Sequence, residues 1–294
     1  MEQFHVPVLL KETLEFLNVR PGEKYIDATL GGGGHTWAII HAGGKVLGID
    51  QDKEALEYVK SNPEFPVPNS RLVITYGNFA HLKEIAAEAN FSQVAGILLD
   101  LGLSGYQVES AGRGFSFRQD APLDMRMDQT VETATAADLL NGLGREELAK
   151  LFRVYGEEPF AQALARAIVR QRKTGKITTT AQLAEIVSRV VGKRQGKIHP
   201  ATLVFQALRI AVNDEINCLK AVLPQAQELL KKDGRLVVIS FHSLEDRIVK
   251  DYFRGQAVLK VLTEKPLAAT PEEIRINPRA RSAKLRAAEK TVKE

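Results

Sequence analysis

The sequence of 294 residues contains a single cysteine, Cys218, which excludes a disulfide framework and any zinc or redox site built on paired cysteines. It contains no apolar run near the roughly 18 residues of a membrane span, because apolar stretches such as Ala95–Leu99 are only as long as a strand. The first residues, Met1–Val8, lack the basic start and the apolar stretch of a signal peptide. Together these absences predict a cytoplasmic protein that has no membrane segment.

Charge is unevenly distributed along a chain of otherwise ordinary composition. With 44% hydrophobic residues the chain can bury a sizeable core, and its length suits two domains or one domain with an insertion. Residues 1–105 carry 8 basic and 13 acidic side chains, whereas residues 106–209 carry 16 and 11 and residues 210–294 carry 16 and 12. A basic excess confined to part of a chain indicates a polyanionic partner, although basic helices are more often simply solvated faces.

Segments typical of strands alternate with segments typical of helices over the first part of the chain. The predicted strands are Lys24–Ala28, Lys45–Ile49, Arg71–Tyr76, Val94–Leu99 and Arg235–Ser240, with a terminal pair at Ala257–Thr263 and Leu285–Lys290. Apolar strands separated by helices indicate a parallel sheet that is covered on both faces. The fold class is therefore predicted to be α/β and doubly wound.

The sheet is predicted to be interrupted by an all-helical insertion. No convincing strand pattern lies between Gly105 and about Gly196, where several helical stretches appear. A long helix is expected to begin at Pro200 and to end or kink near Pro224. The economical layout is one α/β domain made of residues 1–105 and 210–294, with residues 106–209 as a second domain inserted into it.

Glycines and polar residues follow the predicted strands, at the edge where open α/β sheets bind ligands. The first strand leads to the run Gly31–Gly34, which lets the backbone approach a ligand closely. The second strand ends at Asp50, placed to accept hydrogen bonds from a ribose diol, and the next two lead to Phe79 and Asp100. Both aspartates end apolar strands, where a purely structural role is costly, whereas Phe79 alone is more often a core residue.

The glycine pattern bears on which cofactor this edge binds. A dinucleotide site needs a third glycine in the pattern GxGxxG, but Thr36 and Trp37 stand at the two positions where it would fall. S-adenosylmethionine has no pyrophosphate, and it needs glycines beside its methionine part, an acid at its ribose and an apolar wall at its adenine. The pattern therefore favours S-adenosylmethionine, and a nicotinamide dehydrogenase stays open as an alternative.

Six blocks of the sequence are long and distinctive. They are Gly31–His35, Gly114–Arg118, Pro122–Asp128, His199–Thr202 with Phe205–Ala207, Ser240–Arg247 and Asn277–Ser282. Together they resemble the bacterial ribosomal RNA small subunit methyltransferase H family over nearly the whole chain. The resemblance implies a Rossmann-like class I methyltransferase sheet with an inserted helical domain that helps to hold RNA. It also implies methyl transfer from S-adenosylmethionine to N4 of a cytidine in the decoding region of 16S ribosomal RNA.

The resemblance further implies a set of cofactor contacts, namely Gly33, Gly34, His35, Asp50, Phe79, Asp100 and Gln107. The loop after Asp100 departs from the family pattern, because Gly105-Tyr106 stands where the family usually has Ser-Pro. This exchange replaces a stiff turn with a flexible one immediately before Gln107. Ala121 also stands where the family commonly has glycine, which is a smaller change.

The N4 amino group of cytosine is a poor nucleophile because its lone pair is delocalised into the ring. Side chains that accept its N–H hydrogens localise that pair and can take a proton afterwards. The candidates for this role are Asp100, Asp124 and Asp128 with their loop, Ser240 and His242. Pairing of the loop aspartates with Arg126, and a His242 that only fixes its own loop, are open alternatives. No metal site is expected.

Cations of the inserted domain are candidates for contacts with RNA phosphates. The predicted phosphate-binding residues are Arg166, Arg170, Arg172, Lys173, Lys193 and Arg194. Further candidates are Lys176 and Lys197, with Arg279 and Arg281 near the C-terminus. Aromatic residues are candidates for stacking on an unpaired base or for packing within the insertion, and these are Tyr106, Phe115, Phe117 and Tyr155. The expected substrate is free 16S ribosomal RNA or the small ribosomal subunit, and the enzyme is either a monomer or a homodimer.

Two further functions stay open at this point. The segment Gly102–Gly105 resembles part of the serine hydrolase elbow GxSxG, but that motif needs a glycine where Tyr106 stands. A non-catalytic ribosome-binding protein that keeps a cofactor pocket would have the same sequence features as the enzyme.

Overall fold

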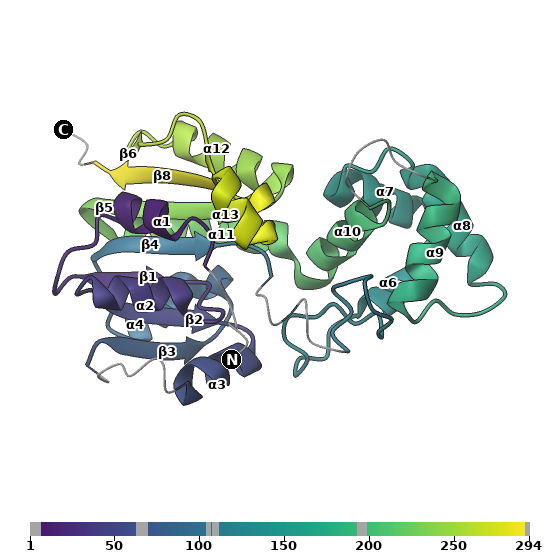
Figure 1. Ribbon diagram of the computed structural model, residues 1–294, viewed down its shortest axis with the longest axis horizontal. Coiled ribbons are helices and arrows are strands. Elements are labelled where there is room, and N and C mark those ends of the chain that lie inside the picture. The colour runs from purple at the N-terminus through teal and green to yellow at the C-terminus, as the bar shows by residue number, and fades with distance from the viewer. Residues whose placement is uncertain (1–6, 63–69, 104–106, 108–111, 193–198, 292–294) are drawn as a thin grey trace. The chain divides into compact units, whose positions relative to one another are not determined.

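The computed structural model describes residues 7–62, 70–103, 107, 112–192 and 199–291. The chain divides into two compact units, of which the first combines Met1–Ser104 with Asn217–Glu294 and the second is Gly105–Ile216 (Figure 1). The second unit ends at Ile216 rather than at the predicted residue 209, because a helix continues across that position. Among the described residues, no helix is both long and apolar enough to cross a membrane.

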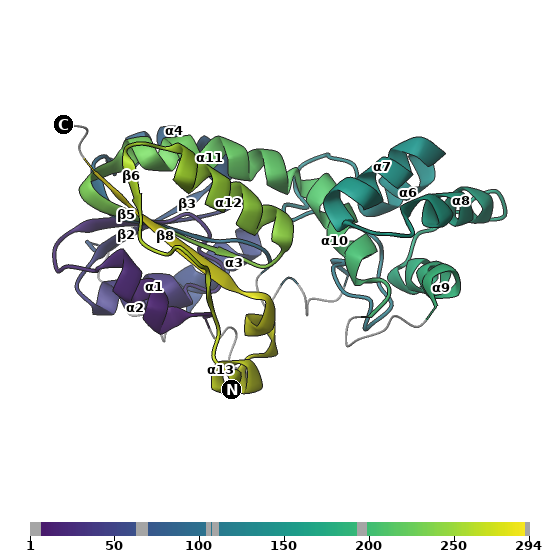
Figure 2. The ribbon, with the colours of Figure 1, turned by 90° about the horizontal axis from the view of Figure 1, so that it is seen from above.

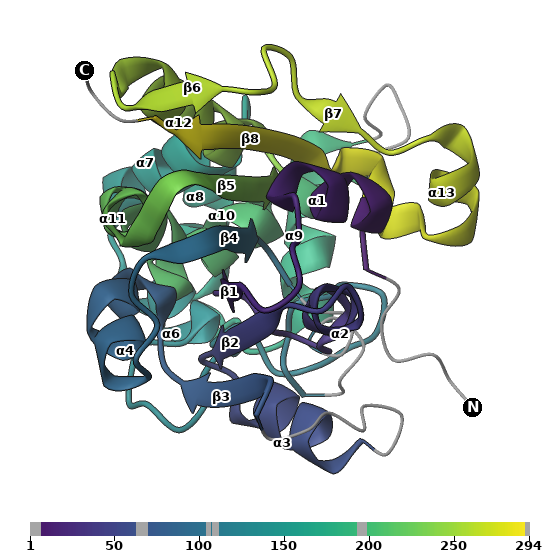
Figure 3. The same cartoon turned by 90° about the vertical axis from the view of Figure 1, so that its left-hand side faces the viewer.

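The first unit is built on one sheet, which runs in the order β3-β2-β1-β4-β5-β8-β6, with β7 paired to β8 (Figure 3). Its strands are β1 (Lys24–Asp27), β2 (Lys45–Asp50), β3 (Leu72–Tyr76), β4 (Val94–Asp100), β5 (Leu230–Ser240), β6 (Leu259–Val261), β7 (Leu267–Ala268) and β8 (Lys284–Lys290). The first five strands are parallel, and β8 is antiparallel to both β5 and β6. The chain moves outward from β1 to β3 and returns on the other side at β4, so the switch point lies between the carboxyl ends of β1 and β4.

Helices cover both faces of this sheet, which confirms the predicted α/β fold class (Figure 2). One face is covered by α1 (Leu10–Leu17), α2 (Gly34–His41) and α3 (Lys53–Ser61), and the other by α4 (Leu82–Glu88), α11 (Glu215–Leu229) and α12 (Ser243–Gly255). Alternate residues of each strand enter opposite cores, so that Ile97 packs with α4 and α11 whereas Leu98 packs with α1 and α2. The remaining helical elements of the unit are η1 (Phe79–His81), α13 (Pro271–Ile276) and η2 (Pro278–Ser282).

Two sequence expectations for the C-terminal half were wrong in detail. The helix expected to run from Pro200 to near Pro224 is two helices, because Asp214 adopts a left-handed conformation with φ of 50° and ends α10 (Thr202–Asn213). Pro224 lies inside α11 and does not end it. Strand β5 begins at Leu230 rather than Arg235, since the segment between them is accommodated as an irregularity opposite β4.

The second unit has a hydrophobic core of its own. The helices that the structure describes in it are α6 (Ala136–Gly142), α7 (Arg145–Gly156), α8 (Ala161–Gln171), α9 (Thr180–Val191) and α10. Phe152, Leu164, Leu183 and Leu208 are fully buried between them. Within the described part of this unit the only strand-like pairing is an isolated bridge between Pro122 and Thr179. This unit therefore has the packing of a separate helical bundle.

Candidate functional site

The carboxyl end of β1 is organised by Asp27, whose side chain is only 1% exposed. One carboxylate oxygen accepts a hydrogen bond from the Thr36 hydroxyl at 2.7 Å, and the other accepts one from the Thr29 backbone N–H at 3.2 Å. Asp27 therefore holds both ends of the glycine run. The Thr29 hydroxyl in turn accepts a hydrogen bond from the Asp100 backbone N–H at 2.7 Å, which joins the ends of β1 and β4.

The glycine run needs backbone conformations that other residues rarely adopt. Gly31 has φ of 50° and Gly33 has φ of 79°, and both values lie in the left-handed region that glycine adopts without strain. Helix α2 begins at Gly34, and a Cβ added there would lie 3.0 Å from the Pro7 side chain. The loop therefore keeps its backbone close to its neighbours, as a ligand-binding turn requires.

Asp50 ends β2 and fixes the first glycine of the run. Its carboxylate accepts hydrogen bonds from the Gly31 N–H at 2.7 Å and from the Asp52 N–H at 2.9 Å. Burial raises the pKa of Asp50 to about 6, even though both hydrogen bonds favour the ionised form. Asp50 is therefore an acceptor at the next strand end along the same sheet edge.

Asp100 ends β4 and has unusual surroundings for an acid. Its Oδ2 lies 3.5 Å from His35 Nδ1, while its Oδ1 is buried and has no hydrogen-bond partner among the described residues. Burial raises the pKa of Asp100 well above its usual value, and the neighbouring Asp27 and Glu245 raise it further. Desolvation lowers the pKa of His35 to about 4, so the imidazole is neutral near pH 7. The switch point thus holds a buried carboxyl group with an unsatisfied oxygen.

Phe79 begins η1 and is partly buried against the core beneath the sheet. The Asn78 side chain accepts a hydrogen bond from the Ala80 N–H at 2.8 Å and donates one to the Gln51 side chain at 2.9 Å. These contacts tie the end of β3 to the residue that follows β2. Phe79 therefore follows the strand next to the one that Asp50 ends, and it is half-buried.

The other predicted cofactor contact, Gln107, belongs to the second unit, and its side chain is 5% exposed. Gly105 and Tyr106, the departure from the family pattern, lie outside the described residues, as do Lys193, Arg194 and Lys197. The structure thus gathers Gly33, Gly34, His35, Asp50, Phe79 and Asp100 in one unit. Sequence reasoning left out Thr29 and Thr36, whose hydroxyl groups carry no motif signal of their own.

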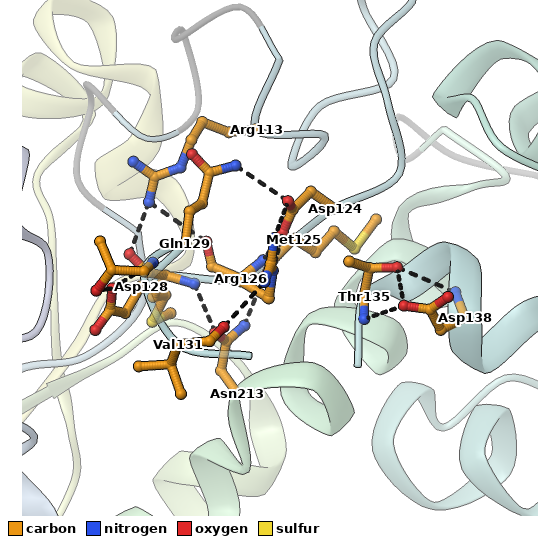
Figure 4. Close-up of polar contacts among 12 residues, drawn as sticks. Arg113, Asp124, Met125, Arg126, Asp128, Gln129, Val131, Thr135, Asp138 and Asn213 are labelled. Atoms are coloured by element: carbon orange, nitrogen blue, oxygen red, sulfur yellow. Dashed lines mark hydrogen bonds and ion pairs between the residues drawn. The ribbon is translucent and has the colours of Figure 1, made fainter. Parts of the chain in front are cut away.

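The Asp124 loop of the second unit is closed by an internal ion pair (Figure 4). The Asp124 carboxylate accepts hydrogen bonds from Arg126 Nε and Nη2, both at 2.8 Å, and from the Gln129 side chain at 3.1 Å. Burial alone raises the pKa of Asp124, but the hydrogen bonds from Arg126 outweigh it and the net pKa is lowered. Both oxygens of Asp124 are thus occupied, as the pairing alternative requires.

Side chains from other segments also bond to the backbone of this loop. The Asn213 side chain of α10 donates to the Met125 carbonyl at 2.8 Å and accepts from the Met127 N–H at 2.7 Å. The buried Arg113 donates to the Met127 carbonyl at 2.8 Å. Gly114 has φ of 73°, and a Cβ there would lie 2.2 Å from the Pro122 carbonyl oxygen. The loop is therefore rigidly positioned by residues far apart in the sequence.

His242 caps α12 in the first unit. Its Nδ1 accepts a hydrogen bond from the Glu245 N–H at 3.4 Å, and the Glu245 carboxylate accepts one from the His242 N–H at 3.3 Å and one from the Phe241 N–H at 2.9 Å. The imidazole also lies within 3.1 Å of the Glu245 carboxylate, and both side chains are buried. This reciprocal arrangement is a capping box, and it fits the alternative in which His242 fixes its own loop. Ser240 donates to the Lys284 carbonyl at 3.3 Å.

The basic residues proposed for RNA differ in what they contact. Arg172 donates through Nη1 to the carbonyls of Leu140 and Leu143 at 2.9 and 2.7 Å, and so satisfies the C-terminal end of α6. Arg166, Arg170 and Lys173 are exposed. Arg166 and Arg170 are four residues apart on α8 and therefore share one face of that helix.

Comparison with known proteins identifies the family. The family model described as MraW methylase family matches residues 2–291. The chain belongs to the MraW methylase family. It is 50% identical to the protein named ribosomal RNA small subunit methyltransferase H of Deinococcus deserti, over 98% of this chain and 94% of that one. The proteins of the same name from Thermomicrobium roseum and Syntrophotalea carbinolica are 50% and 47% identical, over 97% and 96% of this chain and 93% and 96% of theirs.

Proposed function

We propose that this protein transfers a methyl group from S-adenosylmethionine to the N4 amino group of a cytidine in the decoding region of 16S ribosomal RNA. Membership of the MraW methylase family and the name shared by relatives at about half identity support this reaction. The observation that carries the proposal is the buried Asp100 oxygen without a partner at the switch point of the sheet. The reaction takes place on the ribosomal RNA of the cytoplasm.

The residues of the sheet edge fit S-adenosylmethionine. This cofactor carries an ammonium group and a sulfonium group, and a buried carboxyl oxygen with no partner is suited to a cation. Each Asp50 oxygen accepts only one N–H from the described residues and keeps a second lone pair for a ribose diol, and the glycine run leaves room for the methionine part. Phe79 supplies an apolar surface for adenine. When bound, the cofactor supplies a methyl group on positively charged sulfur, which is open to attack by an amine.

The chain must then activate a weak amine nucleophile. Asp100 retains an acceptor oxygen that can receive an N4–H hydrogen bond, whereas each Asp124 oxygen already accepts two hydrogen bonds from Arg126 and Gln129. We therefore assign the acceptor role to Asp100. Asp124 is assigned the role of holding its loop in shape, and His242 that of capping α12.

RNA binding is assigned to the exposed cations of α8 and of the turn that follows it. Arg166, Arg170 and Lys173 present cations to solvent in a unit that carries more basic than acidic residues. Such cations bind phosphates without reading sequence. Arg172 is left out of this surface because its guanidinium donates to the end of α6.

The direct test is methyl transfer from labelled S-adenosylmethionine to undermethylated small ribosomal subunits, naked 16S ribosomal RNA and transfer RNA in parallel. We expect label on the small subunit or on 16S RNA, at N4 of a cytidine after nuclease digestion. An Asp100→Asn variant serves as the control for transfer that depends on the site. Label on transfer RNA alone, or on none of the three, would contradict the proposed function.

A further inference from the structure

The contact between His35 and Asp100 has a defined direction. His35 Nε2 lies 3.0 Å from the Val8 carbonyl oxygen, which can only accept, so the ring carries its proton on Nε2. In the neutral imidazole, Nδ1 is then a lone pair, and this lone pair faces Asp100 Oδ2 at 3.5 Å. A lone pair set against an ionised carboxylate is repulsive. The arrangement is favourable only when one additional proton lies on the pair.

The groups around Asp100 also oppose its negative charge. Asp27 faces it from β1 and Glu245 faces it from α12, while His35 faces it from α2. Among the described residues, no Lys or Arg forms an ion pair with Asp100, and its Oδ1 is unsatisfied. Burial acts in the same direction, because it raises the pKa of Asp100 and lowers that of His35. Of the two groups, the carboxyl is therefore the one that holds the proton.

We propose that the His35–Asp100 pair carries one proton in the free protein and releases it when the cationic cofactor binds beside Asp100. This inference rests on the proposed function, since it takes S-adenosylmethionine as the ligand. The step is balanced: the O–H bond of the Asp100 carboxyl breaks, the carboxylate stays to face the cation, and the proton passes to the solvent. His35 is a positioning residue here, because the Val8 carbonyl fixes its tautomer and so directs its lone pair at the carboxyl.

Proton release has a consequence for the order of events. A protonated Asp100 is a poor acceptor for an amine hydrogen, whereas the carboxylate that remains after cofactor binding is a good one. The cofactor thereby prepares the acceptor for the N4 amino group before the RNA base arrives. Cofactor affinity must also rise with pH, by about tenfold per pH unit below the pKa of the pair.

Isothermal titration calorimetry measures this proton directly. S-adenosylmethionine is titrated into the protein at about pH 7 in two buffers with different ionisation enthalpies, and the difference in heat gives the number of protons released. At this pH the α-amino group of the cofactor, with a pKa of about 8, is mostly protonated, and Asp50, with a pKa of about 6, is mostly ionised. We expect a clear release that approaches, and does not exceed, one proton per bound cofactor. Binding heat that is independent of the buffer would overturn the inference and leave the proposed function standing.

Two substitutions of His35 form a matched pair. Asparagine places an amide N–H donor near the former Nδ1, so that Asp100 can ionise in the free protein, and His35→Asn should release clearly less than one proton. Glutamine reaches the former Nε2 position, keeps the bond to Val8 and puts no donor at Asp100, so that His35→Gln should release nearly as much as the unmodified protein. Melting curves establish that both variants are folded. Release from His35→Asn equal to that of the unmodified protein would overturn the pairing.

Asp100→Asn provides the second check. The amide cannot lose a proton in this range, so any cofactor that still binds at about pH 7 should do so with little or no proton release. A full proton released by this variant would place the titrating group elsewhere and overturn the inference. If the unmodified protein bound no S-adenosylmethionine at all, the proposed function and this inference would both be overturned.

Discussion

The acids at the sheet edge and the acid of the helical unit are chemically alike but have different partners. Among the described residues, Asp27, Asp50 and Asp100 form no ion pair with Lys or Arg, and burial raises the pKa of each of them. Asp124 has an arginine on both of its oxygens, and its pKa is lowered. A buried acid without a cation costs stability in the free protein and is suited to a cationic ligand, whereas a paired acid contributes to structure.

The largest expected effect comes from removing the charge of an unpaired acid at the sheet edge. Asp100→Asn should lower kcat/KM for methyl transfer by about 100-fold or more, because one charged hydrogen bond is worth about 1.5–3 kcal/mol and Asp100 is assigned to both cofactor and amine. Steady-state kinetics with undermethylated small subunits measure this loss.

The same variant should not lose stability. Because the folded pKa of Asp100 is raised, its ionisation costs stability as the pH rises above the unfolded value. Asp100→Asn should therefore melt at an equal or higher temperature than the unmodified protein near neutral pH, and the gain should fade toward about pH 4. A melting temperature that falls sharply at neutral pH would mean that Asp100 is a structural acid like Asp124.

The second effect tests how firmly the Asp124 loop is held. Gly114→Ala should destabilise the helical unit by about 2–4 kcal/mol, since the new Cβ meets the Pro122 carbonyl and φ is positive. Chemical denaturation, followed by the circular dichroism of the helical backbone, measures the loss of stability. Gly175→Ala is the matched control in the same unit, because nothing lies within 4 Å of its Cβ and it should be nearly neutral. Equal effects of the two changes would contradict a rigid loop.

The third effect separates a structural acid from a catalytic one. Asp124→Asn should cost about 1–3 kcal/mol of stability, because it leaves the partly buried Arg126 guanidinium without its charge partner. The rate of methyl transfer should fall only in proportion to the loss of stability. Glu146→Gln, in an exposed pair with Arg145, should produce no measurable change in the denaturation midpoint. A loss of kcat with no loss of stability would assign a catalytic role to Asp124.

The smallest effect concerns the exposed charge of α8. The double change of Arg166 and Arg170 to Ala should weaken RNA binding and lower the magnitude of the salt slope by roughly 1.5–2, with cofactor binding unchanged. Removing Lys150 and Arg153 from α7 takes away the same charge and is the control. Equal slopes for the two double variants would argue against α8 as the RNA surface. Arg172→Ala should instead lower the melting temperature, because it uncaps α6.

Much of the sheet could be predicted because its signals are local. Apolar runs identified the strands that end at Asp50 and Asp100, and consecutive glycines marked the turn before α2. The terminal pair of strands is also present, as β6 and β8. The start of β5 and the break at Asp214 were missed, since a bulge and a left-handed residue leave no periodic trace in the sequence.

The candidate site divides in the same way. The residue types at the strand ends, and their order along the chain, followed from the sequence alone and predicted a cofactor edge. Which side chains are already occupied was decided by tertiary structure, because their partners come from distant segments: Asn213 fixes the Asp124 loop, Arg172 reaches back to α6, and Val8 sets the tautomer of His35. Sequence determined which chemistry the chain can offer, and the fold decided which groups are left free to perform it.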